Sequence, residues 1–371
     1  MDSARRSWCD ADGHRARSNP HRLTFDVQEM NRQAYARKLE ALEALRLATD
    51  SATAREELRK ALKDRGSYMV SKAAAIAAEL KAEELLPELL AAFDRFFTDP
   101  VKSDPQCLAK NAIAKALKDL GHRGAQAYVR GMGHFQFEPA WGGRADTAGT
   151  LRSTCALALT ACNLDDIEIL TQLTDALADP EKLVRINSAI AIEQLGRPEG
   201  ALLLRLKLLS GDQEPEVLGQ SFTSLLSLAP DGGLSFVSRF LKSPNEDVQL
   251  EAASALAQSH DPHAIQILQD FWHEQPISLQ IRHALLINLG ASPMLEAAEF
   301  LLSVITHESS DLAASAIAAL ATSRFRAEMR ERVAAALLEK DSPHLQSIFE
   351  QKFGLSGQDQ PRADHRRTRR G

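Results

Sequence analysis

The sequence is poor in aromatic and β-branched residues. Trp, Tyr and Phe make up only 5% of the 371 residues, and Val and Ile together number 25. Strands are normally filled with such side chains, so their scarcity argues against a fold built on β-sheets. The shortage of aromatic rings also disfavours surfaces that stack on nucleobases or sugars. By contrast, 57 Ala and 52 Leu favour helices, and we therefore expect an all-α protein.

Cysteines and long apolar runs are also scarce. The four cysteines are Cys9, Cys107, Cys155 and Cys162. Their spacing is not that of a disulfide framework. Cys155 and Cys162 are seven residues apart, which on one helix is about 10 Å and too far for a disulfide bond. Buried thiols in a reducing compartment are the simplest interpretation. No stretch reaches the roughly 18 apolar residues of a membrane span. We expect a cytoplasmic protein that does not contact the membrane.

The formal charge of −6 is unevenly distributed. Residues 1–22 carry a net charge of +2 and residues 357–371 a net charge of +3, whereas residues 150–320 hold nine basic and twenty-two acidic side chains. Binding to a phosphate backbone requires clustered cations. Nucleic acid is therefore an unlikely partner for the body of the chain, and contact through the basic tails stays an alternative.

Internal repetition dominates the region between the tails. Six segments begin with an aliphatic residue, carry small or apolar residues four and five positions later, and an aliphatic residue eight positions later. These positions share one face of an α-helix. The first residues, 31 to 33 positions apart, are Leu151, Val184, Val217, Val248, Ile281 and Leu312. We call these six segments the anchored helices, and each is followed by a turn and a second apolar helix. Stacked helix pairs can bury the apolar stripe that a single helix pair would leave exposed to solvent.

Two strings carry a resemblance to a known family. They run from Asp179 to Arg185 and from Ala189 to Gly196, and combine an Asp-Pro turn, Val-Arg, and a small-residue helix ending in Leu-Gly. This pattern resembles HEAT repeats of the phycobilisome-lyase-like type. The resemblance covers roughly residues 66–340. It implies an armadillo-type α-α superhelix, a HEAT-repeat solenoid of about eight helical pairs, and is specific for the fold rather than the function.

We expect three parts along the chain. Residues 1–26 lack periodicity and are expected to be disordered, as is the basic tail 357–371. The solenoid occupies residues 27–356. It carries an inserted loop at 131–149.

That insertion is the first candidate site. Between Ala109 and Leu151 the spacing exceeds the repeat period by about ten residues. The inserted residues gather rings and charges in an otherwise aromatic-poor chain: His134, Phe135, Phe137, Glu138, Trp141 and Arg144. Insertions in solenoids map to surface loops, which often serve recognition. The loop either binds a partner or folds back to cover a helix end.

The second candidate is the face of the anchored helices opposite their apolar stripe. It is more apolar than a solvent-facing surface should be, at Leu157, Ile186, Ile190, Leu250 and Ile287. This pattern indicates a groove for a peptide or a partner helix. Alternatively, neighbouring repeats bury a wider arc of each helix.

Signals for metal or catalytic chemistry are weak. His260 and His263 are close together but belong to a turn without further ligands. The pairs His273-Glu274 and His307-Glu308 superficially resemble those of HEAT-like hydroxylases, but we expect both pairs on loops. No phosphate-binding glycine loop, nucleophile elbow or Cys-x-x-Cys occurs. We expect no catalytic residue, no metal ligand and no cofactor.

The sequence therefore favours a non-enzymatic scaffold. It would bind a protein or peptide, basic or amphipathic, on a concave, acidic and partly apolar face. The alternative is a lyase- or hydroxylase-like enzyme, or a cofactor-assembly factor, of the HEAT-like group.

Overall fold

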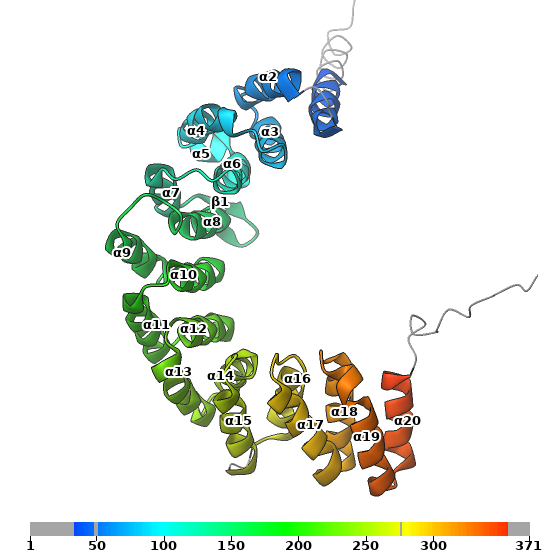
Figure 1. Cartoon of the computed structure of the whole chain (residues 1–371). Helices are drawn as coiled ribbons and strands as arrows, with labels where there is room; N and C mark the ends of the chain where they lie inside the picture. Colours follow the sequence, from blue (N-terminus) through cyan, green and yellow to red (C-terminus); the bar gives the residue numbers. More distant parts are fainter. Residues whose placement is uncertain (1–32, 48–50, 275–276, 355–371) are drawn as a thin grey trace, which may run out of the picture. The chain divides into compact units, whose positions relative to one another are not determined.

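A computed structural model describes residues 33–47, 51–274 and 277–354, almost entirely as helices (Figure 1). The chain divides into two compact units, Met1–His122 and Arg123–Gly371. The all-α fold is confirmed. The segments expected to be disordered, 1–26 and 357–371, lie outside the described residues. Within those residues, no helix combines the length and apolar character needed to cross a membrane.

The first unit consists of short helices that pack in two layers. Helices α3 and α6 contact each other, while α2 packs on α3 and α4 on α6. Val70 on α3 and Ala109 on α6 are both fully buried. The elements are helical residues 33–44, η1 (Leu45–Leu47), α2 (Ser51–Leu62), α3 (Ser67–Glu79), η2 (Glu83–Leu85), α4 (Leu86–Arg95), α5 (Pro100–Ser103), η3 (Pro105–Cys107) and α6 (Leu108–Asp119).

A buried ion pair fixes the start of α6. The Lys110 Nζ lies 3.0 Å from Asp104 Oδ2, and both side chains are fully shielded from solvent. Asp104 also accepts hydrogen bonds from the first backbone amides of the helix, at Ala109 and Lys110. The Asp104 carboxylate thus accepts hydrogen bonds from backbone N–H groups that have no partner within the helix. Its negative charge also compensates the buried Lys110 ammonium group.

The second unit repeats a helix pair from α8 onward. Its elements are α7 (Ala125–Met132), β1 (Phe137–Ala140), β2 (Gly143–Asp146), α8 (Gly149–Leu159), α9 (Asp166–Ala176), α10 (Lys182–Leu195), α11 (Pro198–Ser210), α12 (Pro215–Leu228), α13 (Pro230–Val237), η4 (Ser238–Lys242), α14 (Glu246–Gln258), α15 (Pro262–Glu274), α16 (Leu279–Gly290), α17 (Leu295–His307), α18 (Ser310–Thr322), α19 (Arg326–Lys340) and α20 (Pro343–Phe353).

The anchored helices form one layer of this unit. They are α8, α10, α12, α14, α16 and α18, each in contact with the next (Figure 1). The six predicted anchor residues lie in these helices, and all except the half-buried Val248 are buried. The second helices, from α9 to α19, pack against them. The final helix α20 packs on α18 in the place of a further anchored helix.

Arginines tie successive repeats together. Arg185, the second residue of its anchored segment, forms two hydrogen bonds of 2.8 Å to Asp212, 27 residues later in the turn before the next anchored helix. Lys207 Nζ lies 2.6 Å from the same carboxylate. Burial raises the pKa of Asp212, but the hydrogen bonds from Arg185 and Lys207 outweigh it and lower that pKa to about 2. At the equivalent positions Leu218 and Ala313, a buried apolar side chain interrupts the ladder.

Close packing of α7 on α8 depends on a glycine. A Cβ atom at Gly131 would lie 2.4 Å from the Cys155 Sγ, whereas at Gly133 the nearest atom would be a carbonyl oxygen at 3.7 Å. The absence of a side chain at Gly131 therefore sets how closely the two helices approach.

We predict that Gly131→Ala destabilises the chain by about 1–3 kcal/mol, because the added methyl group overpacks the α7–α8 contact. Gly133→Ala, two residues away, should change the free energy of unfolding by less than about 0.5 kcal/mol. Urea unfolding measures both. Adding Cys155→Ala to Gly131→Ala should recover part of the loss, and equal stability of the two single variants would contradict the packing argument.

We predict that Asp212→Asn lowers the free energy of unfolding by about 2 kcal/mol near neutral pH. Because folding lowers the carboxyl pKa from 3.8 to about 2, this contribution is complete above the unfolded pKa and is lost as the pH falls toward the folded one. Unfolding curves between about pH 3 and pH 7 test it. A difference between variant and wild type that does not shrink below about pH 4 would exclude this role for Asp212.

Candidate functional site

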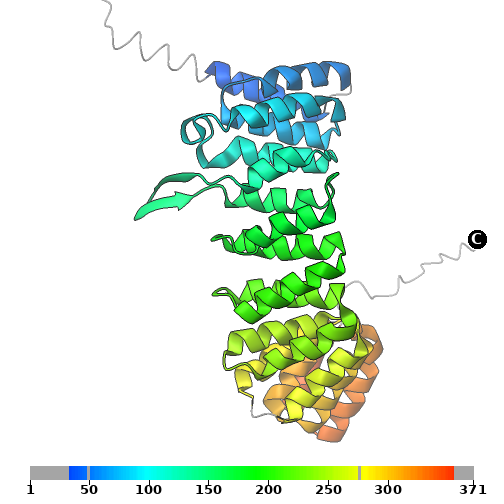
Figure 2. The same ribbon diagram turned by 90° about the vertical axis from the view of Figure 1, so that its left-hand side faces the viewer.

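The residues inserted after α7 form a β-hairpin where we expected an irregular loop. Strands β1 and β2 pair antiparallel, from Phe137 opposite Asp146 to Ala140 opposite Gly143. Figure 2 shows the hairpin extending sideways from the helices. Gly142 at the turn has a φ of +87°, a conformation that favours glycine. The extra ten residues thus project from the repeat array as an ordered element.

Aromatic side chains are exposed along the hairpin. Trp141, at the turn, is fully exposed to solvent, and Phe137 is about half exposed. The rings of Phe135 and Phe137 stack with their centroids 6.5 Å apart. Three of the aromatic residues predicted as contacts are therefore brought together on one element.

The polar residues of the hairpin bond mainly to one another. His134 Nε2 lies 3.1 Å from Gln136 Oε1, and the Gln136 side chain donates to Glu138 at 2.6 Å. Thr147 Oγ1 donates to the same Glu138 oxygen at 2.8 Å. The side chains of His134 and Glu138 thus stabilise the hairpin, and a direct contact with a partner stays a prediction for them.

Arg144 bridges the two strands. Its Nη2 donates a hydrogen bond of 2.6 Å to the Phe137 carbonyl oxygen, while the side chain stays exposed. One face of its guanidinium is therefore accessible beside the aromatic rings.

A buried arginine fixes the base of the hairpin. Arg152 is 1% exposed and forms a two-point contact with Asp179, at 2.7 and 2.9 Å. Its Nη1 donates to Asp146 at 2.6 Å and to the His134 carbonyl oxygen at 3.1 Å. Its Cζ lies 4.0 Å from the centre of the Phe135 ring. One guanidinium therefore joins the hairpin, α8 and the turn before α10.

The charges of this cluster stabilise one another. Burial alone raises the pKa of Asp146, but hydrogen bonds from the Gln136 and Ala148 amides and from Arg152 outweigh it and lower that pKa. Burial likewise lowers the pKa of Arg152, and the bonds to Asp179 and Asp146 outweigh it and raise that pKa. Both groups stay ionised at neutral pH, as a buried pair requires.

A cavity of about 430 Å³ lies next to Arg152. Val129 and Phe135 line its apolar side, and Gln172 and Asp175 line its polar side. Sequence reasoning did not single out Arg152, Asp146 or Asp179 as determinants of the insertion's position. The signal available was the Arg–Asp pair 27 residues apart, which recurs in the next repeat.

The predicted face of the anchored helices is more buried than the hairpin. Leu157, Ile186, Ile190 and Leu250 are half-buried on α8, α10 and α14, whereas Ile287 on α16 is 68% exposed. These residues lie on neighbouring helices of one layer. Both expectations, a groove and a wide buried arc, therefore stay open for this face.

The candidate histidines lie at the ends of helices and in a turn. Within the described ranges, no three His, Cys, Asp or Glu side chains are grouped so that they could hold a metal ion. His273-Glu274 and His307 close α15 and α17, not loops as we expected, because both helices extend further than their sequence pattern indicates. Glu308 accepts a hydrogen bond of 2.8 Å from the Trp272 indole.

The thiols are shielded. Cys107 and Cys155 are buried free cysteines, and Cys162 is half-buried. Burial raises the pKa of Cys155 above its ordinary value and that of Cys162 to about 11. Neither is a ready nucleophile at neutral pH.

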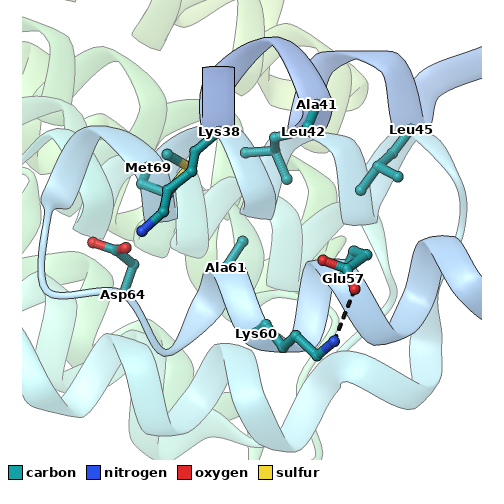
Figure 3. Close-up of a pocket in the computed structure, with 9 residues that line it drawn as sticks. All are labelled: Lys38, Ala41, Leu42, Leu45, Glu57, Lys60, Ala61, Asp64 and Met69. Carbon is teal, nitrogen blue, oxygen red and sulfur yellow. Dashed lines mark hydrogen bonds and ion pairs between the residues drawn. The ribbon is translucent and has the colours of Figure 1, made fainter. Parts of the chain in front are cut away.

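The first unit contains a further cavity of about 510 Å³ (Figure 3). Leu42, Leu45 and Met69 contribute apolar side chains, while Lys60 at the rim is paired with Glu57 at 2.8 Å. None of the predicted site residues lines it.

Comparison with known proteins gives a family match to part of the chain and similarities to solved structures, of which two follow. Residues 202–290 match the family model of HEAT repeats. A complex of CpcE and CpcF of phycocyanin lyase from Nostoc sp. PCC7120 is 17% identical, over 80% of this chain and 94% of that one, with a TM-score of 0.33. An engineered protein is 18% identical over the same shares, with a TM-score of 0.15. No curated protein matches.

The family match covers the region from α11 to α16. Helical pairs continue on both sides of it within the second unit. The expected resemblance to HEAT repeats is confirmed for residues 202–290.

Proposed function

We propose that this chain is a non-enzymatic scaffold that binds a protein or peptide through its hairpin. Trp141 carries the proposal. Its side chain is fully exposed at the turn, so it contributes no burial to folding. Tryptophan is among the residues most enriched at the energetic centres of protein interfaces, because one side chain buries a large apolar area with few rotatable bonds.

The anchoring of the hairpin supports the same proposal. Arg152 bonds to Asp146 and to the His134 carbonyl at the base of the strands. A side chain on an element that is already ordered loses less conformational entropy on binding than one on a free loop. Contacts that Trp141 and Phe137 make with a partner are therefore offset by a smaller entropy loss and contribute more to the binding free energy.

The face of the anchored helices offers a second contact of defined charge. Glu251 on α14 is half-buried, and burial followed by repulsion from Glu216 and Asp247 raises its pKa. A cation of the partner would relieve this repulsion. Together with the exposed Ile287, these carboxylates favour a basic, amphipathic partner.

The chemistry of the described residues supports binding more than catalysis. Burial raises the pKa of Cys155 and of Cys162 and keeps both thiols protonated near neutral pH. Asp146 in the hairpin and Asp179 at its base accept hydrogen bonds from Arg152 and from backbone amides.

We predict that Trp141→Ala weakens partner binding by about tenfold or more, since truncation of a central Trp removes on the order of 2 kcal/mol. The melting temperature should not change, because the side chain contacts no folded element. The measurement is quantitative mass spectrometry of proteins from the source cells retained by the immobilised full chain. Leu338→Ala, at a leucine 75% exposed on α19, is the matched control.

Ile190→Asp tests the anchored face in the same assay. If Trp141→Ala and Ile190→Asp combined still retain every partner at wild-type amounts, the scaffold proposal is wrong. Stoichiometric iron or zinc, or a copurifying chromophore, would instead favour an enzyme or cofactor-assembly factor.

A further inference from the structure

Helix α11 exposes a row of leucines that the proposed function does not use. Leu202, Leu206 and Leu209 are 69%, 61% and 61% exposed. They are four and three residues apart and therefore lie on one face over two turns. The opposite side of α11 is equally apolar and is buried, at Leu204 and Leu208. A helix that is apolar all round is normally covered on all sides.

Two arginines border this leucine row. Arg205 lies three residues after Leu202 and four before Leu209, so it is next to both on the helix surface. Its Cζ is 4.2 Å from the centre of the Phe236 ring on α13, and the Arg239 Cζ is 5.4 Å from the same ring. The ring holds both guanidiniums along one edge of the leucine row.

The other cations of α11 and of the residue before it are paired with carboxylates. Lys207 on α11 pairs with Asp212, and Arg197, before the helix, pairs with Asp166. Within the described part of the chain, neither Arg205 nor Arg239 pairs with a carboxylate. Their charge is thus available, in a stretch of sequence that is otherwise strongly acidic.

Two acidic residues lie at the starts of the helices that carry the row and the Phe236 ring. Glu199 lies in the first turn of α11, and Asp231 in the first turn of α13.

We propose that α11 is a docking site for an acidic amphipathic helix of a partner protein. The partner's apolar face covers Leu202, Leu206 and Leu209, and its carboxylates lie against Arg205 and Arg239. Exposed leucines at helical spacing and unpaired cations at their edge form the two parts of a helix-binding surface. This surface is separate from the hairpin and favours a partner of opposite charge to that expected at the anchored face.

A second copy of this chain fits α11 less well. Two α11 helices packed around a twofold axis at the centre of the row would bring Arg205 of both copies together, whereas Glu199, the carboxylate of α11, lies six residues away along the helix. Like charges at an interface cost several kcal/mol, which disfavours this arrangement.

Selection from a peptide library tests the docking site. Displayed helical peptides of about 14 residues, near the length of α11, carry leucines at positions one, five and eight, with either Glu or Lys at each flanking position. The full chain should enrich peptides with Glu. Leu206→Glu should reduce their affinity by about tenfold or more, and Leu338→Glu should leave it unchanged.

Charge reversal gives the sharper outcome. Arg205→Glu, or the exposed Arg239→Glu, should shift the selected peptides from Glu toward Lys. No enrichment, enrichment of Lys by the wild type, or equal enrichment by Leu206→Glu would overturn the proposal. So would a concentration-dependent dimer in sedimentation that Leu206→Glu abolishes, because the occupant would then be a second copy.

Discussion

A buried guanidinium needs a hydrogen-bond acceptor for each N–H group that no longer contacts water. The acceptors of Arg152 come from three separate segments of the chain. Asp179 takes two of its hydrogen bonds, Asp146 another, and the His134 carbonyl a fourth. Removal of any one acceptor would leave a buried charge insufficiently compensated, which costs several kcal/mol. The position of the hairpin is therefore coupled to the same contact that joins α8 to the repeat beginning with α10. Arg185 and Asp212 form the equivalent contact in the next repeat, and Arg152 extends this kind of contact to an inserted element.

Three surfaces of the second unit then differ in their chemistry. The hairpin presents aromatic rings, the anchored face combines aliphatic residues with carboxylates such as Glu251, and α11 combines leucines with arginines. Stacked helix pairs separate such surfaces because each helix exposes only one side of itself. Three surfaces of different charge and apolar character are what the proposed scaffold would need in order to bind different partners.

Much of the fold is predictable because the periodicity of the sequence is strong. The spacing from Leu151 to Leu312 places six helices correctly, and a break in that spacing locates the insertion. The hairpin itself was not predictable, since its strands are four residues long and contain Pro139 and Gly143, which disfavour strands. It depends on Arg152 and Asp146, whose contact with Asp179 is a tertiary one. The exposure of Leu206 could not be predicted from the sequence either, because a helix with leucines on every side is expected to be completely buried.

The central claim is that the Arg152 contact, more than the pairing of its two short strands, holds the hairpin in place. Hydrogen exchange of the amides of residues 133–148, measured by mass spectrometry on Asp146→Ala and wild type, tests it directly. Arg144→Ala, which removes an exposed bond within the hairpin, is the control. Our account predicts that exchange in Asp146→Ala rises to the rate of an unstructured segment while α10 remains protected, and that Arg144→Ala changes little. Unchanged protection of the hairpin in Asp146→Ala would contradict it.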